Sequence, residues 1–193
     1  MMIFRLPTAF LFLFLFCNAD LQNEFFSMQY SDLDNKPFSF SELKSNKATV
    51  IVFLLSDCPA SQSYSVTLNE LANRYKSNHI GFFGVFPGTF SSDAEMKEFR
   101  DTYKITFPLL KDPNMTLANY LHATVAPGCF LIDSTGEVVY QGRIDDWLYA
   151  LGKKRQVITK HDLDDAIQSV IHNKPVAIKK TIPIGCILEY EAR

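Results

Sequence analysis

The sequence predicts an α/β fold in which a mixed β-sheet carries helices on both faces. Two apolar runs, at residues 50–55 and 79–86, are typical of strands that are buried on both sides. A Ser-Thr-Gly turn between two short strand-like runs indicates a β-hairpin over residues 129–141. Because a crossover pair followed by a hairpin combines parallel and antiparallel strands, the sheet is expected to be mixed.

The first half of the chain is expected to alternate strands and helices. The Phe-x-Phe alternation predicts a short strand at residues 38–40, followed by a helical turn at 41–44. After the strand at 50–55, apolar residues at helical spacing predict an amphipathic helix over 59–76, with an inward face of Leu68, Leu71, Ala72 and Tyr75.

The middle of the chain contains recognisable helix starts. A capping box at residues 92–95 predicts a helix that ends near Lys104. Residues 107–110 are expected to form a short strand at the edge of the sheet. Asp112 is then expected to cap a short helix that Pro113 opens.

The last third is expected to be less regular. Residues 142–158 carry no clear periodicity and are interpreted as an irregular insertion. An apolar stripe predicts a final helix over 160–172, with Thr159 and Asp162 as its capping box. Beyond it, the tail is expected to be extended.

Composition limits the possible functions. The 193 residues are 47% hydrophobic and 21% charged, which is typical of one globular domain with a substantial core. A formal net charge of −2 provides no basic surface for nucleic acid, so no nucleic-acid partner is expected. Four cysteines are too few for a disulfide scaffold.

The N-terminus predicts export. Arg5 precedes an apolar run at residues 6–16 and small residues before Asp20, so residues 1–19 are expected to be a signal peptide. The domain would then span 20–173, followed by an extended tail, 174–193, that carries Cys186. The protein is expected to be periplasmic or extracellular. An alternative is a lipidated Cys17 that attaches the protein to a membrane, as in bacterial lipoproteins.

Cys58 is the main candidate for chemistry. It stands between the apolar run at 50–55 and Pro59, which fits the first turn of a helix because its missing N–H costs nothing there. Free backbone N–H groups and the helix dipole at such a terminus stabilise a thiolate and lower the pKa of its cysteine. Thiolates attack disulfides and peroxides. We therefore predict redox chemistry, against the alternative of a buried structural cysteine.

The segment of strand, polar break, Cys-Pro-Ala-Ser and helix resembles the thioredoxin active site. Motifs at residues 107–113, 126–127 and 130–136 are similar to the redoxin, or alkyl hydroperoxide reductase/thiol-specific antioxidant, branch of that superfamily. The chain is particularly similar to exported, peroxiredoxin-like redoxins of bacteria, which combine Cys-Pro-x-Ser with a Gly-Cys near the C-terminus. This resemblance covers most of residues 36–172 and implies a thioredoxin-like mixed sheet.

The resemblance also implies roles for two further residues. Pro127 would be the cis-proline that faces Cys58, in a loop that shapes the substrate groove and keeps metals off the thiols. Ser61 replaces the second cysteine of thioredoxins, so Cys58 has no disulfide partner within its own motif, although Ser61 could donate a hydrogen bond to the thiolate. Leu55 and Phe53 stand where peroxiredoxins carry a Thr or Ser and a Pro, which argues against efficient peroxide reduction.

The role of Cys186 stays open at the level of sequence. It could form a redox-active disulfide with Cys58, form a permanent staple, or remain a free thiol in a docked tail. Cys129 is expected to be a small buried hydrophobe. His161 could assist proton transfer or be an exposed first-turn residue.

Charged residues of the insertion are also candidates. Arg143, Asp145 and Asp146 could line the entrance of the site, or could be salt-bridged loop residues. Cys58 and Cys186 with a histidine could form a soft site for Cu(I), although no close ligand spacing supports it.

The sequence therefore predicts an exported thiol–disulfide oxidoreductase of the redoxin type. The catalytic candidates are Cys58, Cys186, Ser61 and Pro127, and no cofactor or metal is expected. The partners would be thiol or disulfide protein clients, or peroxide, together with an external thiol as electron donor. The alternatives are a thiol-dependent peroxidase, in which Cys58 becomes a sulfenic acid, and a non-catalytic module that binds copper or a partner protein.

Overall fold

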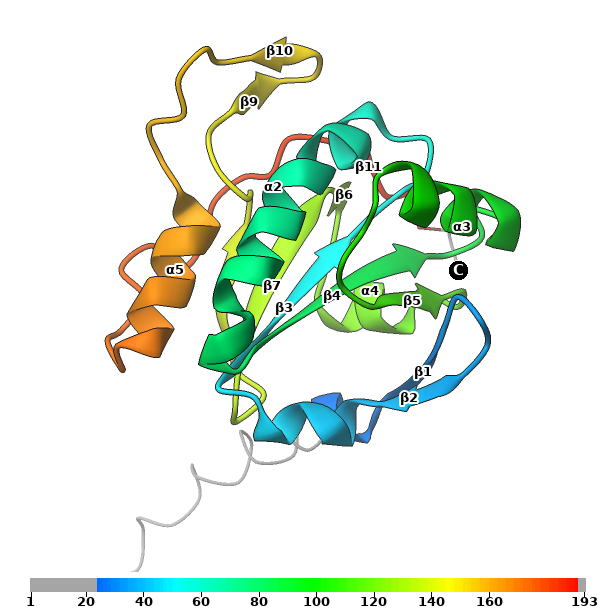
Figure 1. Cartoon of the computed structure of the whole chain (residues 1–193), viewed down its shortest axis with the longest axis horizontal. Helices are drawn as coiled ribbons and strands as arrows, with labels where there is room; N and C mark the ends of the chain where they lie inside the picture. The colour runs from blue at the N-terminus through cyan, green and yellow to red at the C-terminus, as the bar shows by residue number, and fades with distance from the viewer. Residues whose placement is uncertain (1–23, 191–193) are drawn as a thin grey trace, which may run out of the picture.

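A seven-stranded mixed sheet forms the centre of the molecule, with the order β2-β1-β5-β4-β3-β7-β8 (Figure 1). The structure, a computed structural model, describes residues 24–190. The expected signal peptide over 1–19, including Cys17, lies outside the described residues. The α/β class and the mixed sheet that the sequence predicts are confirmed.

The middle of the sheet is parallel and its flanks are antiparallel. β3 (Ala48–Phe53), β4 (Ile80–Pro87) and β5 (Leu109–Asp112) run parallel to one another. The predicted hairpin, β7 (Gly128–Asp133) and β8 (Val138–Gly142), adds antiparallel to β3 on the other side. All six residues of β3 are buried, so the strand that leads to Cys58 is the most enclosed part of the sheet.

The N-terminal segment extends the sheet beyond its expected edge. β1 (Gln29–Asp32) pairs with β2 (Pro37–Ser39) and, on its other side, with β5. The expectation of an edge strand at residues 107–110 is therefore wrong, because β5 lies between β4 and β1. The predicted helical turn is present as the 3₁₀ helix η1 (Phe40–Ser45).

Helices cover both faces of the sheet. α2 (Pro59–Tyr75) and α5 (Asp162–Ile171) lie in front of it in Figure 1, and the short α4 (Thr116–Tyr120) lies behind it. A second crossover helix, α3 (Asp93–Thr102), has the capping box that residues 92–95 predict. The 3₁₀ helix η2 (Lys76–Asn78) continues from the end of α2.

The α4 helix begins later than the sequence predicts. Pro113 does not open it, because the chain first makes a turn in which Met115 has a φ of 54° and caps the helix. Asp112 still stabilises the helix start from the end of β5. Its carboxylate accepts hydrogen bonds from the backbone N–H groups of Thr116, at 2.7 Å, and Ala118, at 2.9 Å.

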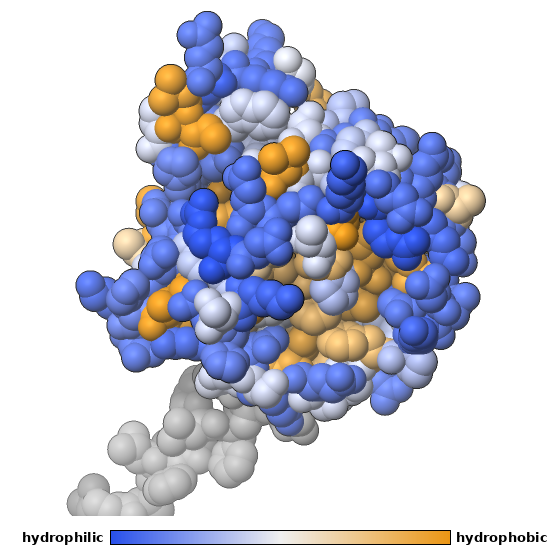
Figure 2. Space-filling view, in the orientation of Figure 1, coloured by the Kyte–Doolittle hydropathy of each residue, from blue (hydrophilic) through white to orange (hydrophobic). Residues whose placement is uncertain are grey.

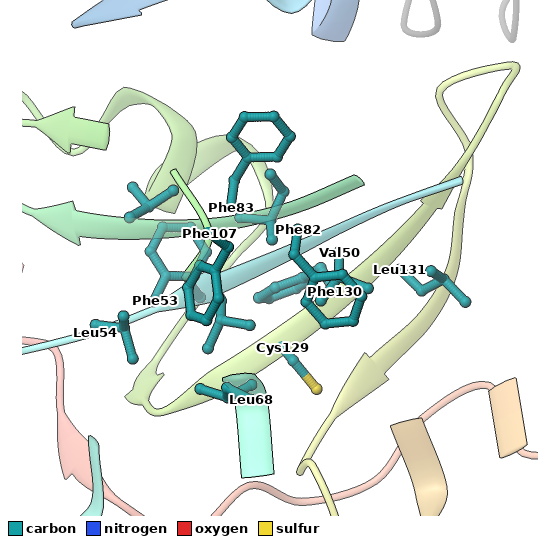
Figure 3. Close-up of a cluster of buried hydrophobic side chains, with 14 of the residues drawn as sticks. Val50, Phe53, Leu54, Leu68, Phe82, Phe83, Phe107, Cys129, Phe130 and Leu131 are labelled. Atoms are coloured by element: carbon teal, nitrogen blue, oxygen red, sulfur yellow. The ribbon is translucent and has the colours of Figure 1, made fainter. Parts of the chain in front are cut away.

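The core is formed largely by aromatic and branched aliphatic side chains between the sheet and its helices. Figure 3 shows part of it, including Phe53 on β3, Phe82 on β4, Phe130 on β7 and Leu68 on α2. Phe53 and Phe130 meet edge to face, with ring centroids 5.7 Å apart. This contact joins β3 to β7, and Leu68 brings α2 into the same hydrophobic core, so both elements that flank the Cys58 loop belong to one core.

The insertion after β8 is more ordered than the sequence indicates. It contains a small antiparallel hairpin, β9 (Leu148–Ala150) and β10 (Lys153–Lys154), that projects from the body of the molecule (Figure 1). The predicted capping box of the last helix is wrong. His161 is the N-cap of α5, and the Thr159 hydroxyl donates to Asp146 at 2.6 Å instead.

The tail returns along the sheet to the start of α2. Its last strand, β11 (Cys186–Ile187), pairs antiparallel with β6 (Val125–Ala126), a two-residue strand that leads into β7. Within residues 24–190, no helix is both long and apolar enough to cross a membrane.

Candidate active site

Cys58 occupies the junction that the sequence predicts. β3 ends at Phe53, a polar turn follows, and Cys58 is the N-cap of α2 with Pro59 in the first turn. The side chain makes no capping hydrogen bond, and its sulfur lies 3.3 Å from the carbonyl oxygen of Ala126. Cys58 is only 1% exposed. Cys58 therefore stands at the N-terminus of α2, where the positive end of the helix dipole lies, and its side chain is closed off from solvent.

The loop that carries Pro127 lies against the sulfur of Cys58. The Ala126–Pro127 peptide bond is cis, as the resemblance implies. The carbonyl that precedes this bond is the one that contacts the Cys58 sulfur. Pro127 follows β6 directly, so the same loop both contacts the cysteine and carries the strand that pairs with the tail.

Ser61 is completely buried in the first turn of α2. Its hydroxyl oxygen accepts a hydrogen bond from the Leu55 N–H at 3.3 Å. Leu55 belongs to the turn between β3 and α2, where its N–H would otherwise lack a partner. Ser61 therefore ties the turn that precedes Cys58 to the helix that follows it.

Cys186 forms a disulfide with Cys58 across 128 residues of sequence. The two Cα atoms are 6.1 Å apart, within the usual range for a disulfide. The sulfur of Cys186 is thus not a free thiol here, which removes one of the three sequence-level alternatives. Its strand approaches Cys58 because Cys186 pairs with Ala126, whose carbonyl contacts the Cys58 sulfur.

Cys129 has a structural environment, as the sequence predicts. It is fully buried on β7, close to Leu68 of α2 (Figure 3). Its S–H donates to the carbonyl oxygen of Gly142 at 3.2 Å. Burial is the main cause that raises the pKa of this thiol far above its ordinary value, so Cys129 remains a protonated, unreactive hydrophobe.

The acidic residues of the insertion do not line an entrance. Asp145 and Asp146 are 3% and 4% exposed. Asp145 accepts a hydrogen bond from the Tyr64 hydroxyl at 2.7 Å, and Asp146 accepts from Thr159 and pairs with Arg155. Asp145 therefore fastens the insertion to α2, whereas Asp146 joins the start of the insertion to its end.

The other two charged candidates, Arg143 and His161, follow the non-catalytic alternatives. Arg143 forms an ion pair with the buried Asp162 at 2.7 Å, so it follows the salt-bridged alternative. His161 is an exposed residue at the start of α5.

The hydroxyl of Ser56, in the turn before Cys58, is bonded to another loop. Ser56 donates from its side chain to Ser91 at 2.8 Å. Ser56 and Asp57 border a hollow of about 240 Å³ whose other walls come from α2 and α3, with Glu95, Glu98 and Phe99 among them. On the face that Figure 2 shows, apolar side chains gather nearby, between α2 and α3.

Among residues 24–190, no group of three His, Cys, Asp or Glu side chains could hold a metal ion.

Sequence reasoning missed the pairing of β11 with β6, and with it the packing roles of Gly185, directly before Cys186, and of Leu188, two residues after it. A Cβ at Gly185 would collide with the Ala126 carbonyl, and Leu188 is 3% exposed. The one signal in the sequence is the small residue directly before Cys186.

Solved structures with the same fold are numerous. A hypothetical protein of Sinorhizobium meliloti superposes with a TM-score of 0.76 at 24% identity, covering 86% of this chain and 92% of that one. An uncharacterised conserved protein of Geobacillus kaustophilus gives a TM-score of 0.75 at 22% identity, covering 86% and 91%. A secreted disulfide oxidoreductase of Mycobacterium tuberculosis, described as homologous to E. coli DsbE, gives 0.57 at 15% identity, covering 78% and 98%. At these identities the similarity shows the fold.

The family is shown by the sequence itself. No curated protein matches the chain. The model of the AhpC/TSA family, however, matches residues 21–141, which include the turn at Cys58 and the cis-proline loop. The chain therefore belongs to the AhpC/TSA family of the thioredoxin-like redoxins and is a thiol oxidoreductase.

Proposed function

We propose that this protein is a two-cysteine thiol–disulfide oxidoreductase in which Cys58 attacks and Cys186 resolves. The observation that carries the proposal is the Cys58–Cys186 disulfide at the N-terminus of α2, beside the cis-Pro127 loop. The helix terminus stabilises the thiolate that cleavage of this bond would release. Cys186 supplies the partner that the Cys-Pro-Ala-Ser motif lacks.

The reaction balances without a cofactor. In the reduced protein, the Cys58 thiolate forms a bond to one sulfur of a client disulfide, and the other client sulfur leaves as a thiolate. The Cys186 thiolate then attacks the Cys58 sulfur and releases the second client thiolate. The client gains two electrons, and the Cys58–Cys186 disulfide forms. A dithiol donor restores the two protein thiols.

Accessibility indicates where the donor attacks. Cys58 is 1% exposed in the oxidised protein, whereas Cys186 is only partly buried. We therefore expect the donor thiolate to attack the Cys186 sulfur, so that the leaving group is the Cys58 thiolate at the helix terminus. The accessible sulfur and the better leaving group then favour the same direction of attack.

Peroxide reduction is the second candidate, because the chain belongs to the AhpC/TSA family. A peroxide would oxidise the Cys58 thiolate to a sulfenic acid, and the Cys186 thiol would condense with it to give the disulfide and water. The environment of Cys58 favours disulfide exchange over this route. Leu55 has no hydroxyl, and the hydroxyl of Ser56 is bonded to Ser91.

Export is part of the proposal. The N-terminal sequence has the pattern of a signal peptide, and a structural neighbour from Mycobacterium tuberculosis is described as secreted. In an oxidising compartment, a reactive disulfide persists between turnovers. Protein clients outside the cytoplasm are the corresponding partners.

Single substitutions test the assignment. Cys58→Ser should abolish dithiothreitol-dependent reduction of insulin, whereas Cys186→Ser should accumulate a mixed disulfide between Cys58 and its substrate. Cys129→Ala is the matched control and should retain the activity, because its thiol is buried and takes no part in the disulfide. Retained activity in Cys58→Ser would contradict the proposal. Rapid peroxide consumption without insulin reduction in the unmodified protein would favour the peroxidase.

A further inference from the structure

The C-terminal strand β11 lies against the Cys58 site in the way that a bound extended peptide would. Cys186 pairs with Ala126 and Ile187 pairs with Val125, and the Leu188 N–H donates to the Thr124 carbonyl at 2.9 Å. This two-stranded ladder is separate from the seven-stranded sheet. Backbone pairing of this kind accepts many sequences, so selectivity must come from the side-chain positions.

The position before the cysteine has room for glycine alone. A Cβ at Gly185 would overlap the carbonyl oxygen of Ala126 and lie 3.0 Å from the backbone nitrogen of Pro127. Those atoms belong to the cis-proline loop that contacts Cys58 and cannot move independently of it. Any larger residue at this position would force the strand away from β6.

The two positions after the cysteine differ sharply. Ile187 is 75% exposed, whereas Leu188 is 3% exposed and belongs to the hydrophobic core. This alternation follows from the strand geometry, because every second side chain faces the protein. The site therefore leaves the side chain at the first position after the cysteine in solvent and encloses the side chain at the second in the hydrophobic core.

We infer that the tail is a built-in copy of the client, and that the site selects extended peptides of the pattern Gly-Cys-x-Leu. This inference rests on the proposed function, since it takes Cys58 as the attacking group. A client strand would replace β11 on β6, with glycine against the Ala126 carbonyl and an aliphatic side chain in the place of Leu188. Because the tail fills the same place, a client binds only after the tail strand has left.

Activated peptides test this selectivity. The protein would be the full chain with Cys186→Ser, and the probe a peptide of residues 182–190 whose cysteine carries a 2-nitro-5-thiobenzoate group. The Cys58 thiolate bonds to the peptide sulfur, and the coloured aryl thiolate leaves with the electron pair. Rates are divided by those with glutathione, which corrects for the intrinsic reactivity of each peptide.

Three altered peptides give the expected pattern. Alanine in place of the glycine, or aspartate in place of the leucine, should slow the reaction at least ten-fold. Lysine in place of the isoleucine should change it less than two-fold. Equal rates for all four peptides would overturn the inference and leave the proposed function standing. No reaction with any peptide would overturn both.

The tail itself provides a second test. In the Cys186→Ser chain, Gly185→Ala should drive the tail strand off β6 and increase the rate with the unaltered peptide at least three-fold. Ile187→Ala is the matched control and should leave the rate unchanged, because that side chain points to solvent. An unchanged or lower rate in Gly185→Ala would overturn the inference.

Discussion

At the scale of single residues, the turn before Cys58 depends on one buried hydroxyl. Ser61→Ala would leave the Leu55 N–H without its acceptor inside the protein. An unsatisfied buried donor costs about 1–3 kcal/mol, so we expect the free energy of unfolding to fall by about that amount in denaturant titrations.

Ser65→Ala is the matched control for this prediction. Ser65 is also buried on α2, but its hydroxyl only donates to the Gln62 carbonyl at 2.7 Å, so its removal leaves no orphaned donor. We expect the loss for Ser65→Ala to be clearly smaller. Equal losses in the two variants would contradict the structural role given to Ser61.

Asp112 gives a pH dependence of stability. Burial raises the pKa of its carboxyl to about 6, against hydrogen bonds from the backbone N–H groups of Ala118, Thr116 and Leu117 that lower it. A raised pKa means that the folded state binds more protons than the unfolded state. The contribution of Asp112 protonation to the free energy of unfolding is therefore complete below pH about 4 and is lost as the pH rises through about 6.

The Asp112→Asn variant isolates this effect. Relative to the variant, the unmodified protein should lose up to about 3 kcal/mol of unfolding free energy between pH 4 and pH 7, at roughly 1.4 kcal/mol per pKa unit. Urea titrations at several pH values measure the difference. A difference between the two proteins that stays constant with pH would contradict the assignment.

At the scale of elements, Asp146 joins the start of the insertion to its end. This carboxylate accepts hydrogen bonds from the Thr159 hydroxyl and from the backbone N–H groups of Thr159 and Lys160. These bonds hold its pKa well below the ordinary value, with the Thr159 hydroxyl as the largest cause. They therefore stabilise the folded insertion above pH about 4 and are lost as the pH falls below it.

Asp146→Ala should release the insertion without unfolding the sheet. We expect hydrogen exchange of the amides in residues 147–160 to accelerate at least ten-fold, while β3 and β7 stay protected. Asp165→Ala, an exposed residue in the first turn of α5, is the control and should leave those amides unchanged. Unchanged exchange in Asp146→Ala would show that the hairpin β9–β10 is anchored elsewhere.

The elements that the sequence predicts well are those with local signals. The periodicity of α2, the capping box at Ser92 and the apolar runs of β3 and β4 all depend on neighbouring residues. The errors arise where distant groups compete. Thr159 has the sequence of a cap, but it bonds to Asp146, which lies 13 residues earlier. No local signal reveals such a partner.

At the scale of the whole molecule, one bond joins the tail to the active-site helix. The Cys58–Cys186 disulfide closes a loop of 128 residues, and chain-entropy arguments give about 5 kcal/mol of stabilisation for such a loop. Reduction should lower the free energy of unfolding by up to that amount, which thermal unfolding with and without dithiothreitol measures. Cys186→Ser should show no response to the reductant. A melting temperature that reduction does not change would contradict this account of the tail.

The candidate site was predictable in part for the same reason as the elements. The apolar run before Cys58 and the proline after it predict a strand–helix junction from neighbouring residues alone. The similarity to redoxins identifies the cis-proline. The position of Cys186 follows only from a tail that crosses the sheet and pairs with β6, which no local pattern encodes. Residue spacing therefore leaves its pairing open, and the three-dimensional arrangement resolves it.

The central claim is that the Cys58–Cys186 bond opens and closes in the folded protein. The most direct measurement is mass spectrometry of the cysteine peptides after equilibration of the native protein in glutathione buffers of graded potential, and after mild peroxide. We predict a reversible transition between one Cys58–Cys186 disulfide and two thiols, with Cys129 unmodified throughout. A bond that opens only on unfolding would make Cys186 a structural staple. Cys58 found sulfenylated or glutathionylated beside a persistently free Cys186 would contradict the two-cysteine mechanism.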